Sequence, residues 1–273
     1  MCRQPIKKKF FCFGLGYTAS YLTDSLEKLN FEVFGTNRVN KNSYIFNEIE
    51  RFPKELLNNV THLLSSIPPG TNGDPAFNYY RDFIRNLPNL EWVGYFSATN
   101  VYGDHQGKWV NETSSLNATD YNSINRINAE KQWSNFLQSH IFRLSGIYGK
   151  GRSILDTIRT KPLIDKQDHY FSRIHVEDIA NIILKSIESP HPGIYNVADD
   201  LPETSLNVGL YACKLLNIDP PKIIAYEDAM LSDRMREFYS NNKKVDNHKI
   251  KEIFNVQLKY PTYQEGLIAI NQA

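Results

Sequence analysis

The sequence predicts an α/β fold built on a doubly wound parallel sheet, with a small lobe toward the C-terminus. The first observation is an apolar run, 10–13, that breaks into closely spaced glycines. A helical pattern follows, because Leu22, Leu26 and Leu29 fall on one face. The second observation is the repetition of strand and helix patterns, which is typical of a parallel sheet. The third is size, since 273 residues with 41% hydrophobic and 22% charged residues can bury a sizeable core.

The first turn has the pattern G-x-G-x-x-A, from Gly14 to Ala19. Gly14 permits a tight turn, Gly16 lets a pyrophosphate approach the backbone, and Ala19 allows close packing of strand and helix. The helix start offers unpaired N–H groups and a positive dipole end. A glycine turn can also be purely structural, but its position at the start of a βαβ unit favours nucleotide binding. The expected contacts are Gly14, Gly16, Tyr17 and Thr18.

The residues after the second strand, 31–35, indicate which dinucleotide is bound. An NAD site usually has an acid about 20 residues beyond the glycines, whereas an NADP site has an arginine for the extra phosphate. Here Thr36, Asn37 and Arg38 follow the strand, with no acid among them. All three can bond a 2′-phosphate, and Arg38 can do so bidentately. The sequence therefore predicts NADP(H) in preference to NAD(H), the alternative being that Arg38 is a solvated loop charge.

A further buried strand, 60–67, ends in two serines before a pair of prolines that stop it. In a doubly wound sheet, ligands lie at the carboxyl ends of the strands. Ser65 and Ser66 are therefore expected to border the dinucleotide, although a plain turn is an equally open interpretation. The other expected elements are strands over 44–46, 91–96 and 193–198, helices over 47–57, 77–86 and 206–216, and an apolar helix that follows His175.

Composition limits the partners of this chain. The 31 basic and 30 acidic residues leave a net charge of +1, which favours neither nucleic acid nor an anionic membrane. No apolar stretch reaches the roughly 20 residues of a membrane span, so we expect a cytoplasmic protein with a small-molecule substrate. Cys2, Cys12 and Cys213 lie far apart, so we expect neither disulfides nor a metal site. A homodimer is left open.

Five segments occur in an order that resembles the NAD-dependent epimerase/dehydratase family, the extended-type short-chain dehydrogenases. The segments are the glycine turn, 97–104, Ala129-Glu130, 143–149 and 174–180. The resemblance spans most of the chain and is closest to an atypical branch, whose last segment is similar to 240–245 and 260–263. It implies a Rossmann-type doubly wound sheet and a nicotinamide coenzyme.

The resemblance also implies a Ser/Thr at the end of the fifth strand and a Tyr-x-x-x-Lys pair on the next helix. In that chemistry the tyrosine passes a proton while hydride moves, and the lysine lowers the pKa of a phenol that is ordinarily ~10. Here the three positions are occupied by Ala98, Asn122 and Arg126. An amide is no general acid near neutral pH, and a guanidinium can hold a ribose but hardly relays a proton.

Three residues are therefore the catalytic candidates: Thr99, Tyr121 and Arg126. Thr99 flanks the serine/threonine position, as does Ser97. Tyr121 precedes the tyrosine position, and one helical residue turns a side chain by about 100°. Tyr121 would thus point elsewhere unless the helix begins differently. The weaker candidates are Tyr102, His105, Tyr148, Arg152, Arg173 and His175, for which packing, turn, surface or ion-pair roles are the expected ones.

These observations divide the chain into a dinucleotide-binding domain, 1–148, and a C-terminal part, 149–273, in which a substrate lobe is interleaved with 174–198, a stretch that returns to the sheet. The resemblance implies an oxidoreductase or epimerase-like enzyme that acts on a carbonyl or sugar-nucleotide substrate with an atypical active site. The alternative is an NADP(H)-binding sensor or regulatory protein with little turnover.

Overall fold

A computed structural model describes residues 7–39, 43–47 and 49–272 of the chain. These residues form two compact units, each built from three segments. Unit 1 comprises the described residues within Met1–Ser97, Ile124–Phe142 and Ala180–Ile194, and unit 2 comprises those within Ala98–Ser123, Arg143–Ile179 and Tyr195–Ala273. Cys2 lies outside the described residues, and Cys12 and Cys213 are buried free thiols. Among the described helices, none is both long and apolar enough to cross a membrane.

The central element is a seven-stranded sheet with the order β12-β7-β5-β4-β1-β2-β3. From β5 to β3, each neighbouring pair of strands is parallel. The α/β Rossmann-type fold that the sequence predicts is thereby confirmed. The strands are β1 (Lys9–Phe13), β2 (Glu32–Asn37), β3 (Tyr44–Ile45), β4 (His62–Ser65), β5 (Trp92–Ala98), β7 (Ser139–Leu144) and β12 (Gly193–Val197).

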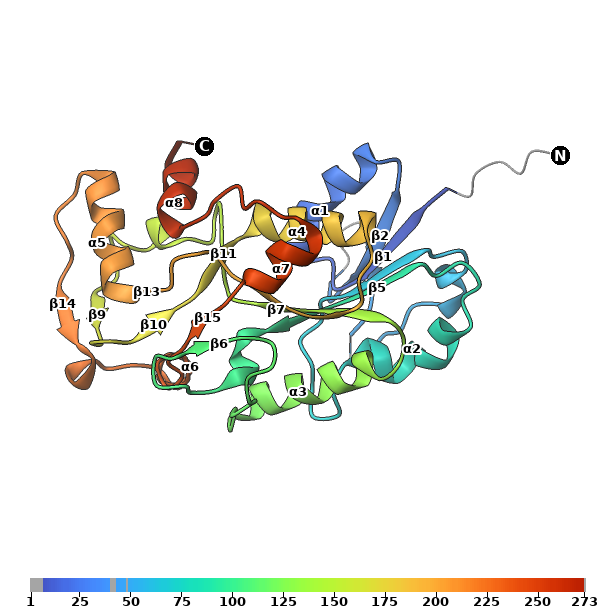
Figure 1. The fold of residues 1–273 in the computed structure, drawn as a ribbon, viewed down its shortest axis with the longest axis horizontal. Coiled ribbons are helices and arrows are strands. Elements are labelled where there is room, and N and C mark those ends of the chain that lie inside the picture. Colours follow the sequence, from blue (N-terminus) through green and yellow to red (C-terminus); the bar gives the residue numbers. More distant parts are fainter. Residues whose placement is uncertain (1–6, 40–42, 48, 273) are drawn as a thin grey trace. The chain divides into compact units, whose positions relative to one another are not determined.

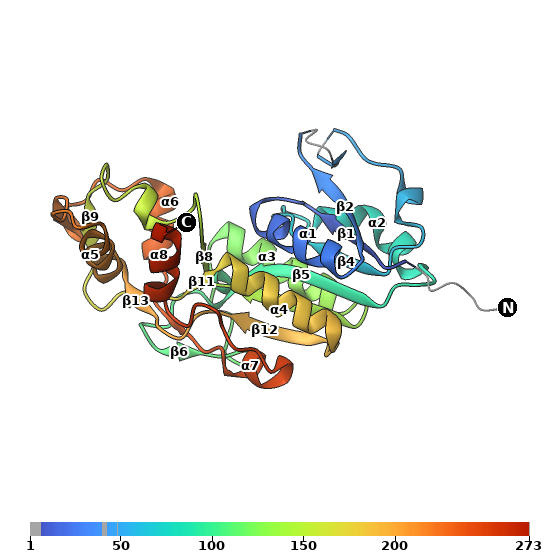
Figure 2. The same ribbon diagram turned by 90° about the horizontal axis from the view of Figure 1, so that it is seen from above.

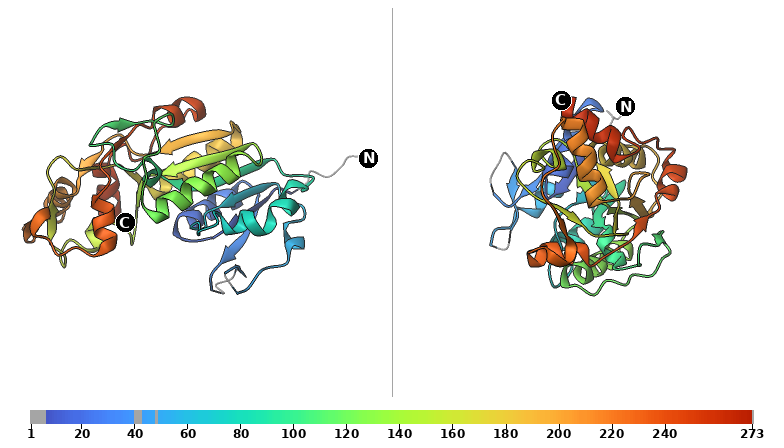
Figure 3. Two further views of the ribbon diagram at one scale, coloured as in Figure 1. Left: turned by 90° about the horizontal axis from the view of Figure 1, so that it is seen from below. Right: turned by 90° about the vertical axis from the view of Figure 1, so that its left-hand side faces the viewer.

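Helices cover both faces of this sheet. Figure 1 shows α1 (Tyr17–Lys28) and α4 (Val176–Glu188) on one face, and α2 (Pro75–Arg85) and α3 (Tyr121–Ser134) on the other. The view from above in Figure 2 has α1 and α4 in front of the strands, and the view from below in Figure 3 has α3 and α2 in front. Between them lies a core rich in aromatic rings, where Phe13 packs within 6 Å of Phe52 and Tyr80.

Unit 2 is built from short strands and helices around a second apolar cluster. The clustered residues include Tyr148, Leu163, Val208 and Leu267. Its strand pairs are β8 (Gly146–Tyr148) with β11 (Arg173–His175), β9 (Leu163–Asp165) with β14 (Ile223–Ala225), β10 (Tyr170–Phe171) with β13 (Glu203–Thr204), and β6 (Trp109–Val110) with β15 (Lys244–Val245). Its helices are α5 (Ser205–Leu216), α6 (Asp233–Tyr239), α7 (His248–Phe254) and α8 (Tyr263–Gln272), with short 3₁₀ turns at Thr99–Tyr102, Ile154–Asp156 and Tyr226–Asp228.

The helix expected over 47–57 is wrong for most of its length. Residue 48 lies outside the described residues, and among 47 and 49–57 only Lys54–Leu57 is helical, as a single 3₁₀ turn. Upstream, the Asn47 side chain accepts hydrogen bonds from the amides of Ile49 and Glu50, a local turn that competes with helix formation. Pro53 then disfavours helical backbone at the residue before it.

Two buried histidines in unit 1 make its stability sensitive to acid. His62 and His140 flank Trp92, with ring centroids 6.5 and 5.4 Å from the indole. Burial lowers the pKa of each to about 4 from an ordinary 6.5. Both rings therefore stay neutral in the fold at a pH where the unfolded chain takes up protons.

We expect the contribution of these two histidines to the free energy of unfolding to be constant above pH 6.5 and to fall as the pH drops from 6.5 toward 4. At pH 5 the loss is about 2 kcal/mol for each histidine. Urea unfolding at pH 7 and pH 5 measures it. His62→Phe should reduce the difference between the two pH values, whereas His248→Gln, on an exposed side chain, should not. An unchanged pH difference in His62→Phe would contradict this assignment.

Candidate functional site

The glycine turn of unit 1 is held rigidly between β1 and α1. Gly14 has a φ of +84°, which favours glycine, and a Cβ there would lie 3.1 Å from Ile67. The Gly14 amide donates to the Thr36 hydroxyl at 3.1 Å, and the Leu15 amide donates to the Thr36 carbonyl at 2.7 Å. The Ser66 hydroxyl donates to the Gly14 carbonyl at 2.6 Å. The ends of β2 and β4 thus fix the turn that precedes α1.

The N-terminus of α1 has the properties of an anion site. Gly16 is its N-cap and supplies no side-chain cap, and none of the first-turn residues is acidic. A Cβ built at Gly16 would meet no described protein atom within 4 Å except the Gly14 carbonyl at 3.9 Å. Protein packing therefore does not explain glycine here, whereas close approach of a phosphate does. These residues fit the pyrophosphate of a dinucleotide.

The residues predicted to contact a 2′-phosphate differ in their surroundings. Thr36 is buried and its hydroxyl accepts from Gly14. The Asn37 side chain accepts from the Val39 amide at 3.1 Å. Arg38 is exposed, and its guanidinium forms no hydrogen bond or ion pair with any described residue. Of the three, Arg38 has the side chain that is available to a ligand.

The two serines at the end of β4 also differ. Ser66 fixes Gly14, as described above, whereas Ser65 is fully buried and donates to Asp74 at 2.6 Å. Asp74 further accepts from the Trp133 indole at 3.0 Å and from the Phe77 amide at 3.0 Å, where it caps α2. Burial raises the pKa of Asp74, against the effect of these hydrogen bonds. The Ser65 hydroxyl thus donates its hydrogen bond to a carboxyl group that has a structural role.

Two residues near the end of β5 are engaged within unit 1. The Ser97 hydroxyl donates to the Glu130 carboxylate at 2.5 Å. The Arg126 guanidinium, in the position that the resemblance gives to lysine, donates to the Phe96 carbonyl at 3.0 Å. Arg126 thereby ties α3 to β5.

Unit 2 contains a cavity of about 1040 Å³, and Thr99 is the one catalytic candidate of the three that lines it. Asn122 also lines it and donates to Glu237 at 3.4 Å. Tyr121 is 60% exposed and is not among the lining residues. Because α3 begins at Tyr121, successive residues turn away from each other. The amide, rather than the phenol, faces this cavity.

The cavity wall is both aromatic and charged. Phe171 and Phe238 stack on each other, with centroids 4.0 Å apart and planes at 7°. Arg173 lines the cavity while donating to the carbonyls of Phe171 and Glu203. The remaining ionisable lining residues are Asp120, Tyr148, Arg152, Asp156, Tyr170, Asp233, Glu237 and Lys243.

The other candidates have structural partners. The Tyr102 hydroxyl donates to Asn196 at 2.6 Å and accepts from Arg143 at 3.0 Å. Tyr148 is mostly buried and donates to the Thr262 carbonyl at 3.4 Å. His105 is close to the Ser115 carbonyl at 3.2 Å, and His175 packs against the Tyr260 ring at 4.1 Å.

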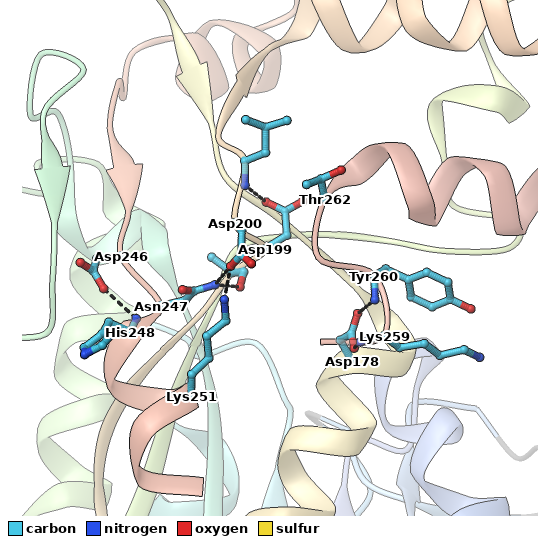
Figure 4. Close-up of polar contacts among 12 residues, drawn as sticks. Asp178, Asp199, Asp200, Asp246, Asn247, His248, Lys251, Lys259, Tyr260 and Thr262 are labelled. Atoms are coloured by element: carbon cyan, nitrogen blue, oxygen red, sulfur yellow. Dashed lines mark hydrogen bonds and ion pairs between the residues drawn. The ribbon is translucent and has the colours of Figure 1, made fainter. Parts of the chain in front are cut away.

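Carboxylates of unit 2 hold its C-terminal segment, as Figure 4 shows. Asp178, at the start of α4, accepts from the amides of Lys259 and Tyr260 at 2.6 and 3.1 Å. Asp200 pairs with Lys251 and accepts from the Asn247 side chain at 2.7 Å. These contacts organise the fold. No cluster of three or more metal-ligating side chains occurs among the described residues.

Lys243 is the feature of the cavity that the sequence analysis missed. It lies in the segment 240–245, which the resemblance singled out without giving it a role. A lysine in a polar segment is normally exposed, and only the tertiary fold shows that this one is buried.

The chain has the fold of the NAD-dependent epimerases and dehydratases. The dTDP-glucose 4,6-dehydratase of Bacillus anthracis, solved with NAD, aligns with a TM-score of 0.76 and 16% identity over 97% of this chain and 96% of that one. The human epimerase family protein SDR39U1, solved with NADPH, aligns with a TM-score of 0.76 and 13% identity over 97% and 99%. At these identities the likeness establishes the fold alone.

A nearer relative is a conserved protein of unknown function from Silicibacter pomeroyi DSS. It shares 39% identity with this chain, with a TM-score of 0.91 over 97% of this chain and 98% of that one. The chain belongs to the same family as this protein. No protein-family model matches the sequence, and no curated protein matches it.

Proposed function

We propose that this protein binds a nicotinamide coenzyme, NADP(H) in preference to NAD(H), and acts as an oxidoreductase or epimerase-like enzyme on a carbonyl or sugar-nucleotide substrate. The observation that carries this proposal is the start of α1, where a rigid glycine turn leads to a helix N-terminus without a side-chain cap, at a glycine whose Cβ would meet only the Gly14 carbonyl within 4 Å. The fold shared with a dTDP-glucose dehydratase solved with NAD supports it. Residues 1–148 would hold the coenzyme, and 149–273 would shape the substrate side.

Different residues of the chain would bind the coenzyme and the substrate. The amides after Gly16 bind the pyrophosphate, and Arg38 bonds the 2′-phosphate bidentately. In unit 2, Thr99 and Asn122 present a hydroxyl and an amide to a substrate in the cavity, and the stacked Phe171 and Phe238 offer it a flat apolar wall. When bound, the nicotinamide supplies or accepts a hydride.

A titration of protein fluorescence with NADPH and with NADH tests the binding step and the role of Arg38. Arg38→Ala should weaken NADPH binding by about 10- to 100-fold, which is the effect of a charge-assisted hydrogen-bonded pair, and leave NADH binding unchanged. The control is Arg81→Ala, which removes a half-exposed arginine of α2 that pairs with Asp82. Equal affinities of the unmodified protein for the two coenzymes would refute the phosphate assignment.

The alternative is a coenzyme-binding sensor or regulatory protein with little turnover. Asn122 in the tyrosine position, and Arg126 bonded to a backbone carbonyl, favour it, because neither residue is a proton donor near neutral pH. Incubation with NADPH or NADP and a panel of UDP- and dTDP-hexoses distinguishes the two functions. Tight coenzyme binding without any product would favour the sensor.

A further inference from the structure

Lys243 is a buried amine on the wall of the unit 2 cavity. Its residue is 8% exposed, and it lines the cavity together with Thr99 and Asn122. The ammonium donates to the Gly103 carbonyl at 3.1 Å. No carboxylate among the described residues forms an ion pair with it. An ammonium has three N–H groups, so this contact leaves donor capacity for a molecule in the cavity.

The backbone on both sides of Lys243 is fixed. The Asn242 amide donates to Asp104 at 3.0 Å, and its side chain donates to the Asp168 carbonyl at 2.8 Å and accepts from the Tyr170 amide at 2.9 Å. The Val245 amide donates to the Ser172 hydroxyl at 2.9 Å. The backbone beside the lysine is thus held by Asp104, by residues 168–170 at the start of β10 and by Ser172 before β11. Such preorganisation is expected of a group that must meet a substrate atom.

We propose that Lys243 is the proton-transferring residue of this cavity, where it takes the role that the missing tyrosine has in the related folds. In the reducing direction the coenzyme, when bound, would supply a hydride from the C4–H bond of the reduced nicotinamide, which would form a C–H bond at a substrate carbonyl carbon while the nicotinamide is oxidised. The carbonyl oxygen then takes a proton from Lys243, so that one N–H bond breaks and one O–H bond forms. The neutral amine regains its proton from solvent, and the oxidising direction reverses these steps. This inference rests on the proposed function.

The surroundings suit the amine to this task. Burial lowers the pKa of Lys243 to about 8, although the charges of Asp104 and Asp120 act to raise it. Burial also lowers the pKa of His169 to about 4, so that this neighbour is neutral at pH 7. A general acid works best when its pKa is near the operating pH. Other ionisable groups on the surrounding segments include Lys166, Asp168, Tyr170, Arg173, Asp233 and Glu237.

The first test follows the amine itself and needs no turnover. The protein is acetylated with trace acetic anhydride between pH 6 and 11, and mass spectrometry measures the extent of labelling at each lysine. The pH at which labelling is half-maximal gives the titration midpoint of each amine. Lys243 should titrate near pH 8, and UDP-glucose at millimolar concentration should slow its labelling. The internal control is Lys244, which lies over the Tyr170 ring and is not a lining residue. A Lys243 that is unreactive, or that titrates with Lys244, would overturn the proposal.

The second test compares Lys243→Arg, Lys243→Met and the control Lys244→Met in NADPH oxidation with the active sugar nucleotide. Lys243→Arg keeps the charge but cannot give up a proton near neutral pH. We expect kcat to fall at least 100-fold, with unchanged NADPH affinity and thermal midpoint, and the decline of the unmodified protein's kcat/KM above pH 8 to disappear. Lys244→Met should keep the full rate.

The outcomes separate the two proposals. If the unmodified protein turns over and Lys243→Arg retains its kcat, the role of Lys243 is wrong and the proposed function stands. If the protein binds neither NADPH nor NADH, the proposed function fails, and Lys243 as its proton donor fails with it, whatever the labelling shows. If coenzyme binds and no substrate is found, the labelling comparison alone decides.

Discussion

Gly16→Val is expected to abolish coenzyme binding while the protein still folds. The backbone at Gly16 is in the extended region, with φ −103° and ψ −165°, and a Cβ there would meet no described protein atom closer than 3.9 Å. Valine therefore costs the fold little. Its two methyl groups would fill the space that a pyrophosphate needs beside the first-turn amides. Losing several charge-assisted hydrogen bonds amounts to at least ~100-fold in affinity.

The measurement is a fluorescence titration with NADPH beside a thermal unfolding curve. Asp24→Val is the matched control, because it adds the same β-branched residue to an exposed position of α1 without touching the glycine turn. Both variants should show similar thermal midpoints, and only Gly16→Val should lose binding. Unaltered titration curves for Gly16→Val would contradict the placement of the pyrophosphate and the proposed function with it.

The β1–α1–β2 unit could be predicted from the sequence because its determinants are local. The apolar run, the glycine spacing and two of the leucines act within one turn or one strand, and the structure has them in place. Leu22 and Leu26 are buried on α1, whereas Leu29, which was expected on the same face, is the C-cap of the helix and is 51% exposed. The helix expected over 47–57 failed for a reason that is also local but was overlooked. The Asn47 side chain and Pro53 both oppose helical backbone, and they outweigh the propensity of the residues between them.

The site was less predictable, because burial depends on contacts far apart in the sequence. In the structure α3 begins at Tyr121, and Asn122 rather than Tyr121 lines the cavity of unit 2. Ser65 was expected to border the coenzyme, but its hydroxyl bonds to Asp74, whose burial involves Trp133. Lys243 carried no signal, since nothing in its neighbours along the chain indicates burial.

Asp74→Ala is expected to be the most destabilising single substitution that we predict in unit 1. Asp74 is fully buried and accepts from the Ser65 hydroxyl, the Trp133 indole and the Phe77 amide. Alanine removes the N-cap of α2 and leaves three buried donors unpaired. The lost cap, which is the bond from the Phe77 amide, costs ~1 kcal/mol. Each of the other two buried donors costs ~1–3 kcal/mol when unpaired, partly relieved by water, so we expect a loss of about 3–5 kcal/mol.

Urea unfolding at pH 7 measures this loss. Asp74→Asn should cost less than Asp74→Ala, because its amide oxygen still caps the Phe77 amide while its NH₂ group cannot accept from Trp133. Asp82→Ala, on the same helix but with a side chain that is 87% exposed, should change the free energy of unfolding by no more than about 0.5 kcal/mol. If Asp74→Ala lowered the free energy of unfolding no more than Asp82→Ala does, the buried hydrogen bonds of Asp74 would not stabilise the end of β4 next to the glycine turn. In that case breaking the hydrogen bond between Ser65 and Asp74 would cost little free energy. The Ser65 hydroxyl would then be available for its predicted contact with the coenzyme.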